Sequence, residues 1–170
     1  LGLADFDRSA KISGSGFYFL KGDLGLLNQA LIQFAISQLS QKGFEYHEPP
    51  LMLRKEAYKT GVSLDDFEDV MFEVADEDKY LIATSEAPML AQFMNEDFHE
   101  DDLPIKQCAY SMCFRKEVGS HGIDTKGLYR THQFNKVEQI AVTLPENSWE
   151  VHEELQKNAE KIHQLLELHY

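Results

Sequence analysis

The chain has 170 residues, of which 43% are hydrophobic and 26% are charged, and its formal net charge is −13. This length suits one domain with a substantial apolar core, and the composition is that of an ordinary soluble globular protein. So acidic a chain is not a general nucleic-acid binder, because such proteins are usually basic. Neither a membrane-spanning apolar run of about 18 residues nor a basic-then-apolar leader appears, so a membrane span and a secretory signal are unsupported.

Cysteine use points to a reducing environment. Cys108 and Cys113 are the only cysteines, and they lie close together in the sequence. Two thiols without a second pair make neither a disulfide framework nor a zinc site. We therefore expect reduced thiols on or beside a strand and a cytoplasmic location.

The first part of the chain predicts a strand, a helix and an extended segment. The aromatic run at 17–20 is typical of a strand. Apolar residues at helical spacing predict an amphipathic helix over roughly 24–42. Residues 44–52 look extended, but their two prolines restrict them to an edge or an end of a sheet.

The middle of the chain predicts short elements. Residues 54–60 suit a short helix, and 70–74 with 80–83 suit a hairpin around an acidic turn. Ser85 is a candidate N-cap for a helix over about 86–95, which has a proline in its first turn.

The last part of the chain predicts a long hairpin followed by a helix. Two strands, at about 107–117 and 128–142, are joined by a loop rich in glycine. A helix starts at about Ser148, where Asn147 and Glu150 resemble a capping box. Helices thus alternate irregularly with hairpins, which predicts an α+β domain with an antiparallel β-sheet flanked by helices.

One stretch of this acidic chain is cationic. The segment from Lys106 to Lys136 carries six basic and two acidic residues, a local charge of +4. Such a stretch suits a small anionic ligand, for example a polyphosphate. Chance clustering on a solvated face is the alternative that composition leaves open.

One face of the second long strand is polar. Side chains alternate between the faces of a strand, so one face carries Arg130, His132, Phe134, Lys136 and Glu138. This mixture packs poorly as a core, but arginine suits phosphate and an aromatic ring suits a planar base. Arg115 and Glu117 share a face of the partner strand, so all these groups are predicted to converge on one cleft. An exposed ladder of ion pairs is the alternative.

Several runs of residues resemble the class II aminoacyl-tRNA synthetases. Phe114-Arg115-x-Glu117, followed by Arg130-x-x-x-Phe134, resembles their motif 2, and Gly43-Phe44 leading to Pro50 resembles the end of their motif 1. The loop after Glu117 and the run from His132 to Glu138 resemble the seryl-tRNA synthetases in particular. The run Leu81-Ile82-Ala83-Thr84-Ser85-Glu86 resembles the serine-binding segment of that family. The similarity covers nearly the whole chain.

The resemblance implies an ATP site. Arg115 would bind the α-phosphate and the serine carboxylate, and would stabilise charge as that carboxylate attacks. Glu117 would accept a hydrogen bond from the adenine amino group, Phe134 would stack on the adenine, and Arg130 would hold the γ-phosphate.

The resemblance also implies a serine site and a reaction. Thr84, Arg115 and Glu138 would bind serine, which ATP activates to seryl-adenylate before transfer to tRNA(Ser). Mg²⁺ would accompany ATP, with its ligands outside this chain. Within the chain no metal site is expected, because His121 and His132 lack a third ligand at metal spacing.

The resemblance further implies an incomplete catalytic domain. Residues 1–170 would be its N-terminal and middle part, carrying motifs 1 and 2. The coiled-coil tRNA-binding arm and motif 3 would be absent, so the isolated chain is expected to be weak or inactive. A homodimer is expected through about residues 24–52. Two alternatives stay open: a ligase that loads an amino acid onto a carrier protein, and a non-catalytic synthetase-derived binding protein.

Overall fold

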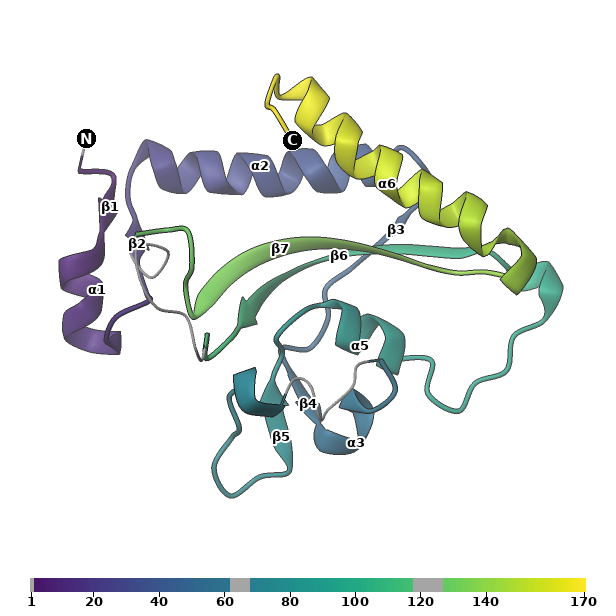
Figure 1. Ribbon diagram of the computed structural model, residues 1–170, viewed down its shortest axis with the longest axis horizontal. Coiled ribbons are helices and arrows are strands. Elements are labelled where there is room, and N and C mark those ends of the chain that lie inside the picture. The colour runs from purple at the N-terminus through teal and green to yellow at the C-terminus, as the bar shows by residue number, and fades with distance from the viewer. Residues whose placement is uncertain (1, 62–67, 118–126) are drawn as a thin grey trace.

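The computed structural model describes residues 2–61, 68–117 and 127–170 (Figure 1). The helices are α1 (Phe6–Ser13), α2 (Asp23–Ser40), α3 (Lys55–Tyr58), α5 (Glu86–Ala91) and α6 (Ser148–Leu165). The strands are β1 (Ala4–Asp5), β2 (Phe19–Leu20), β3 (Glu45–His47), β4 (Met52–Arg54), β5 (Lys79–Leu81), β6 (Ile105–Phe114) and β7 (Gln133–Val142). Short 3₁₀ turns lie at Glu68–Val70, Glu100–Asp102 and Pro145–Asn147.

A long hairpin forms the centre of the molecule. β6 and β7 pair antiparallel from Ile105 opposite Val142 to Phe114 opposite Gln133. β3 lies along the other edge of β6 and runs parallel to it, in the order β3-β6-β7. Figure 1 shows α2 and α6 on one side of this sheet and α3, α5, β4 and β5 on the other. The sheet is therefore a platform between two layers.

Each face of β6 packs into a different core, as strand alternation requires. Cys108 points toward α2 and α6 and packs with Leu39 and Phe44. Its neighbour Ala109 points the other way and packs with Met89 and Ile140. The face that carries Ala109 is also the face that carries the polar residues described below, since Ala109 lies opposite Glu138.

A further core lies below the sheet and supports the segment before α5. It contains Leu53, Tyr58, Met71, Tyr80, Ile82, Ala83 and Ala87, all at most 9% exposed. The Tyr58 hydroxyl accepts a hydrogen bond from the Ala83 N–H at 3.1 Å and donates one to the Leu81 carbonyl at 3.0 Å. These contacts fix the backbone directly before Thr84.

Most predicted elements are present, with shifted ends or partners. The parallel pairing of β3 was not predicted, although β3 does end before the prolines and lies at an edge of the described sheet. The predicted hairpin of 70–74 with 80–83 is present in part: Glu73 bridges antiparallel to Tyr80, and the N–H groups of Val74 and Leu81 donate to the carbonyls of Lys79 and Phe72, both at 2.9 Å. The additional pairing of β5 with β4 was not predicted. Tertiary packing of Leu53 and Tyr80 in one core favours the β4–β5 pair.

The predicted N-cap positions are confirmed, because Ser85 and Asn147 directly precede α5 and α6, but both have helical φ and ψ and neither makes a side-chain capping bond within the described residues. The Ser85 hydroxyl is instead buried, with no hydrogen-bond partner among the residues that the structure describes. Both cysteines are free and buried in β6, as predicted. Within the described residues, no helix has the length and apolar character that crossing a membrane requires.

Candidate active site

Arg115 stands where β6 ends, and three backbone hydrogen bonds hold the chain there. The N–H of Phe114 donates to Ile82 at 2.8 Å, that of Arg115 to His132 at 2.9 Å, and that of Lys116 to Val70 at 2.7 Å. Three separate segments thus fix the direction in which Arg115 leaves the sheet. Lys116 and Glu117 follow before the described chain is interrupted.

The Arg115 side chain lies over the face of β7. Its Nε donates to the Ala83 carbonyl at 3.1 Å, and its guanidinium carbon is 5.1 Å from the centroid of the Phe134 ring. A guanidinium over a ring at this distance is a cation–π contact. One bond and one stacking contact orient the planar fork of Arg115.

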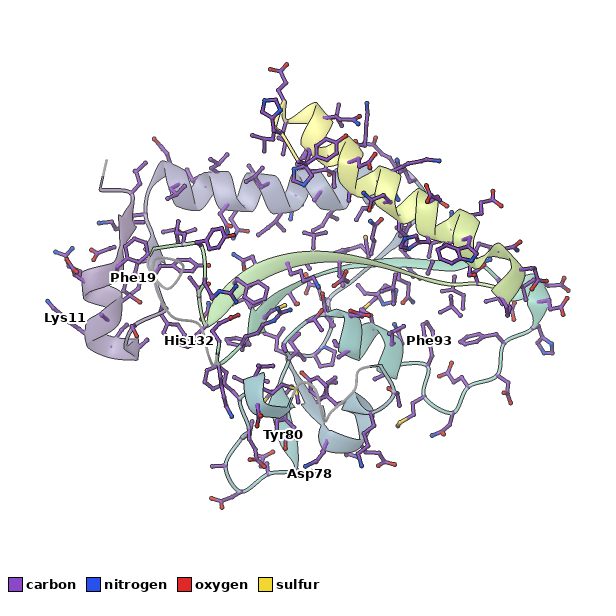
Figure 2. The ribbon with its side chains drawn as sticks, viewed as in Figure 1. Lys11, Phe19, Asp78, Tyr80, Phe93 and His132 are labelled. Carbon is purple, nitrogen blue, oxygen red and sulfur yellow. The ribbon has the colours of Figure 1, made fainter. Side chains whose placement is uncertain are left out.

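His132 is the residue that ties the N-terminal segment to Arg115. Its Nδ1 lies 2.9 Å from the Arg115 carbonyl oxygen, and its N–H donates to the Gly16 carbonyl at 2.8 Å. The ring of His132, labelled in Figure 2, packs against those of Phe17 and Phe72, with centroid distances of 5.4 and 6.1 Å. The imidazole is therefore used in packing and support.

A pocket of about 350 Å³ opens beside Arg115. Its lining consists of Arg115, Glu117, Leu128, Tyr129, Arg130, Thr131 and Phe134. The Arg130 Nη1 lies 2.6 Å from the Glu117 Oε2, and their side chains are 43% and 18% exposed. Cations, one carboxylate and aromatic rings around a cavity of this size suit a nucleotide with its phosphates.

A second polar cluster lies further along the same face of β7. The Thr84 hydroxyl donates to the Glu138 Oε2 at 3.2 Å and accepts from the Lys136 Nζ at 3.0 Å and the Glu86 N–H at 3.2 Å. Lys136 also forms an ion pair with Glu138. Thr84 is only 4% exposed, whereas the Lys136 and Glu138 side chains are 31% and 19% exposed, so the cluster extends from a buried hydroxyl to the surface.

Arg115 connects the pocket to the cluster. It lines the pocket, and its Nε is bonded to Ala83, the residue before Thr84. Along β7, Phe134, Lys136 and Glu138 are two residues apart and share one face. A ligand that fills both places would therefore have its two parts joined near Arg115.

All six predicted site residues lie in these two places, but their predicted layout needs one correction. β6 ends at Phe114 and β7 begins at Gln133, so Arg115, Glu117, Arg130 and His132 lie outside the strands. Alternation along a strand therefore does not explain why Arg130 and Glu117 lie close together. Their ion pair brings them together. The predicted loop from 118 to 126 lies outside the described residues.

The sequence reasoning missed the parts played by Lys136 and Tyr58. Lys136 was counted on the polar face without a role, although a cation two residues from Glu138 on one strand face is a recognisable signal. Tyr58 carried no signal, because its bond to Ala83 joins residues 25 positions apart. Burial of the Tyr58 phenol raises its pKa to about 12.

The described residues do not form a metal site. Within 2–61, 68–117 and 127–170, no three histidine, cysteine, aspartate or glutamate side chains come together to hold an ion. His132 is engaged with Arg115, and His121 lies outside these ranges.

Comparison with known proteins gives one consistent result. The family described as tRNA synthetase class II core domain (G, H, P, S and T) matches residues 69–170. Serine--tRNA ligase from Methanoregula boonei is 53% identical over 169 residues, which are 99% of this chain and 40% of that protein.

Solved structures agree with the sequence comparison. Seryl-tRNA synthetase from Pyrococcus horikoshii, complexed with ATP, has a TM-score of 0.92 and 48% identity, covering 96% of this chain and 36% of its own. Cytoplasmic serine-tRNA ligase from Naegleria fowleri, in complex with AMP, has a TM-score of 0.91 and 44% identity, covering 96% and 39%. The chain thus spans about 40% of the length of the relatives it matches.

Proposed function

Because the chain belongs to the class II tRNA synthetase core family and is similar to its seryl-tRNA synthetases, we propose that it activates serine with ATP for transfer to tRNA. The family and the α+β fold predicted from the sequence are thereby confirmed. The observation that carries the proposal is the position of Arg115 between the pocket and the Thr84–Glu138 cluster. We assign ATP to the pocket and serine to the cluster.

In the proposed first step, a serine carboxylate oxygen attacks the α-phosphorus of ATP. The bond between the α-phosphorus and the oxygen that bridges to the β-phosphate breaks, and pyrophosphate leaves with the bonding electrons. No proton is removed, because the carboxylate is already ionised at neutral pH. Arg115 offers a planar fork to the carboxylate and the α-phosphate together, which lowers the energy of the crowded anionic transition state.

The remaining pocket residues bind the nucleotide. Phe134 gives the adenine an aromatic platform, Glu117 accepts from its amino group, and Arg130 reaches the γ-phosphate. Because Glu117 and Arg130 are paired at 2.6 Å in the free protein, ATP binding exchanges this ion pair for bonds to opposite ends of the nucleotide. Mg²⁺ would accompany the phosphates and offset their charge, held by residues other than those described here.

Serine selection belongs to Thr84 and Glu138. A site whose buried polar groups bind a hydroxyl and an ammonium rejects alanine, because alanine leaves one of those groups unpaired. In the second step the terminal ribose hydroxyl of tRNA attacks the seryl carbonyl, loses its proton and displaces AMP.

The proposal includes a homodimer, formed through about residues 24–52. α2 exposes Leu26, Leu27 and Leu31 at 69%, 53% and 41%. Exposed leucines at this spacing on one helix suit burial in an interface. Sedimentation of the full chain checks this: replacement of Leu26 and Leu27 by Glu should convert dimer to monomer. A cytoplasmic location likewise stays a prediction.

Serine-dependent exchange of pyrophosphate into ATP tests the activation step. Because the chain spans about 40% of its relatives, we expect weak exchange with serine, less with alanine or threonine, and loss of at least about 100-fold in Arg115→Ala. Charging assays with tRNA and with a carrier protein, run side by side, distinguish the proposed ligase from two alternatives: a ligase that loads an amino acid onto a carrier protein, and a non-catalytic synthetase-derived binding protein. Exchange that does not depend on serine would overturn the assignment.

A further inference from the structure

Lys136 bonds to both side chains to which the proposed function assigns serine. Its Nζ bonds to the Thr84 hydroxyl at 3.0 Å and forms an ion pair with Glu138. A serine ammonium bound to these two groups would take the position that the Lys136 ammonium holds. We propose that Lys136 holds this place before serine binds, is displaced when serine binds, and then acts as a second cation beside Arg115 at the reacting groups. This inference rests on the proposed function.

The hydrogen bonds of Thr84 require the displacement. A hydroxyl has one hydrogen to donate and two lone pairs to accept. The Thr84 hydroxyl donates to Glu138 and accepts from Lys136 and from the Glu86 N–H, so all its positions are filled. A serine ammonium only donates, so it can bond to Thr84 only after one of the two present donors leaves.

Lys136 is the donor that can leave. The Glu86 N–H belongs to the backbone at the first residue of α5, next to the buried Ser85 and Ala87. The Lys136 ammonium sits on a four-carbon stem that can rotate, and its side chain is 31% exposed. Two ammonium groups on one Glu138 carboxylate would also repel each other, which favours exchange over joint occupation.

The position of Lys136 on β7 determines where the freed cation goes. Phe134, Lys136 and Glu138 share one face, so Lys136 stands between the nucleotide platform and the serine site. The serine carboxylate and the α-phosphate must meet in this interval, beside Arg115. A compact ammonium there adds positive charge where negative charge develops in the transition state.

Substitution of Lys136 gives opposite effects on serine binding and on rate. In the full chain, Lys136→Met keeps the length of the stem but removes the competing cation. We expect the dissociation constant of serine, measured by calorimetry without ATP, to fall at least about threefold. The kcat of serine-dependent exchange should fall about 100-fold, because the second cation is lost. A purely structural role would impair both.

Further variants guard against misfolding. Lys136→Arg keeps a cation and should retain kcat within about tenfold of the unaltered chain. Lys136→Gln, also uncharged, carries the same expectations as the methionine variant should that variant fail to fold. Lys106→Met is the matched control: Lys106 pairs with Glu154 at 2.7 Å on the other side of the sheet, so both parameters should be unchanged.

The outcomes separate the two proposals. Unchanged or weaker serine binding in Lys136→Met and Lys136→Gln would overturn the place-holding role. An unchanged kcat would overturn the role of the second cation. The kcat comparison requires serine-dependent exchange by the unaltered chain, whereas the calorimetric comparison does not. If the unaltered chain binds serine but shows no exchange, the activation step is not carried out by this chain alone, and the place-holding role of Lys136 is still decided by the serine dissociation constants.

Discussion

The guanidinium of Arg115 lies over the ring of Phe134, 5.1 Å from its centroid, so the proposed catalytic cation and the proposed adenine platform support each other. Phe134→Leu should raise the KM for ATP in the exchange reaction about tenfold, since stacking of a base on an aromatic ring is worth about 1–3 kcal/mol. Phe134→Tyr keeps the ring and should stay close to the unaltered value. Equal KM values for the leucine and tyrosine variants would remove the platform from the mechanism.

Glu117 and Arg130 form an ion pair that serves the ligand more than the fold. Arg130 is 43% exposed, so removal of the pair should lower the free energy of unfolding by no more than about 1 kcal/mol. Glu117 and Arg130 are proposed to contact different parts of ATP, so a comparison of ATP binding with AMP binding distinguishes their roles. Arg130→Gln should weaken the binding of ATP about tenfold and leave the binding of AMP unchanged, because AMP has no γ-phosphate.

Glu117→Ala is the matched variant. It removes the acceptor for the adenine amino group, so the dissociation constants of ATP and AMP measured by calorimetry should rise by similar factors, about three- to tenfold. Selective loss of ATP alone in this variant would assign Glu117 to the phosphates instead.

The elements predicted from local patterns agree best with the structure. Helical spacing of apolar residues predicted 24–42, and α2 covers Asp23–Ser40. Pairing between segments far apart in sequence was not predicted. β4 pairs with β5 because Leu53 and Tyr80 enter one core, which no short window reveals. The ends of the two long strands were also set too far outward, since β6 ends at Phe114 and β7 begins at Gln133.

The candidate site was predicted by residue type more successfully than by geometry. Thr84 and Glu138 are 54 positions apart, and only the resemblance brought them together; their hydroxyl–carboxylate bond of 3.2 Å supports that pairing. Lys136 was visible on the polar face, yet its bond to Thr84 depends on how α5 packs below β7. The support of Ala83 by Tyr58 was not predictable for the same reason.

Gly16 lies against His132, the residue that supports Arg115. A Cβ on this residue would come within 2.4 Å of His132 Cδ2, and its φ of +83° already disfavours a side chain. Gly16→Ala should therefore lower the free energy of unfolding by about 2 kcal/mol or more and displace His132. The kcat of exchange should fall as well, because His132 bonds to the Arg115 carbonyl.

Gly14 provides the control for backbone strain. Its φ is +82°, but a Cβ there would meet nothing within 4 Å. Gly14→Ala should cost only about 1 kcal/mol and leave kcat unchanged. Denaturant unfolding of both variants gives the difference, and equal losses would show that contact with His132 is unimportant.

Tyr58 is expected to affect both the stability of the fold at alkaline pH and the proposed serine site. Burial raises its pKa to about 12, whereas an unfolded tyrosine has a pKa of about 10. The unfolded chain thus releases this proton first, so the stabilisation is complete below about pH 10 and is lost as pH rises toward 12. Two pKa units correspond to at most about 3 kcal/mol.

Tyr58→Phe tests this link in two pH ranges. Near neutral pH the variant should be less stable by about 1–3 kcal/mol, because the buried Ala83 N–H loses its acceptor at 3.1 Å. Between pH 10 and 12 its free energy of unfolding should fall less steeply than that of the unaltered chain, since one buried phenol is gone. Ala83 also binds Arg115, so the KM for serine should rise. Parallel pH curves from urea unfolding would show that another group dominates the alkaline loss.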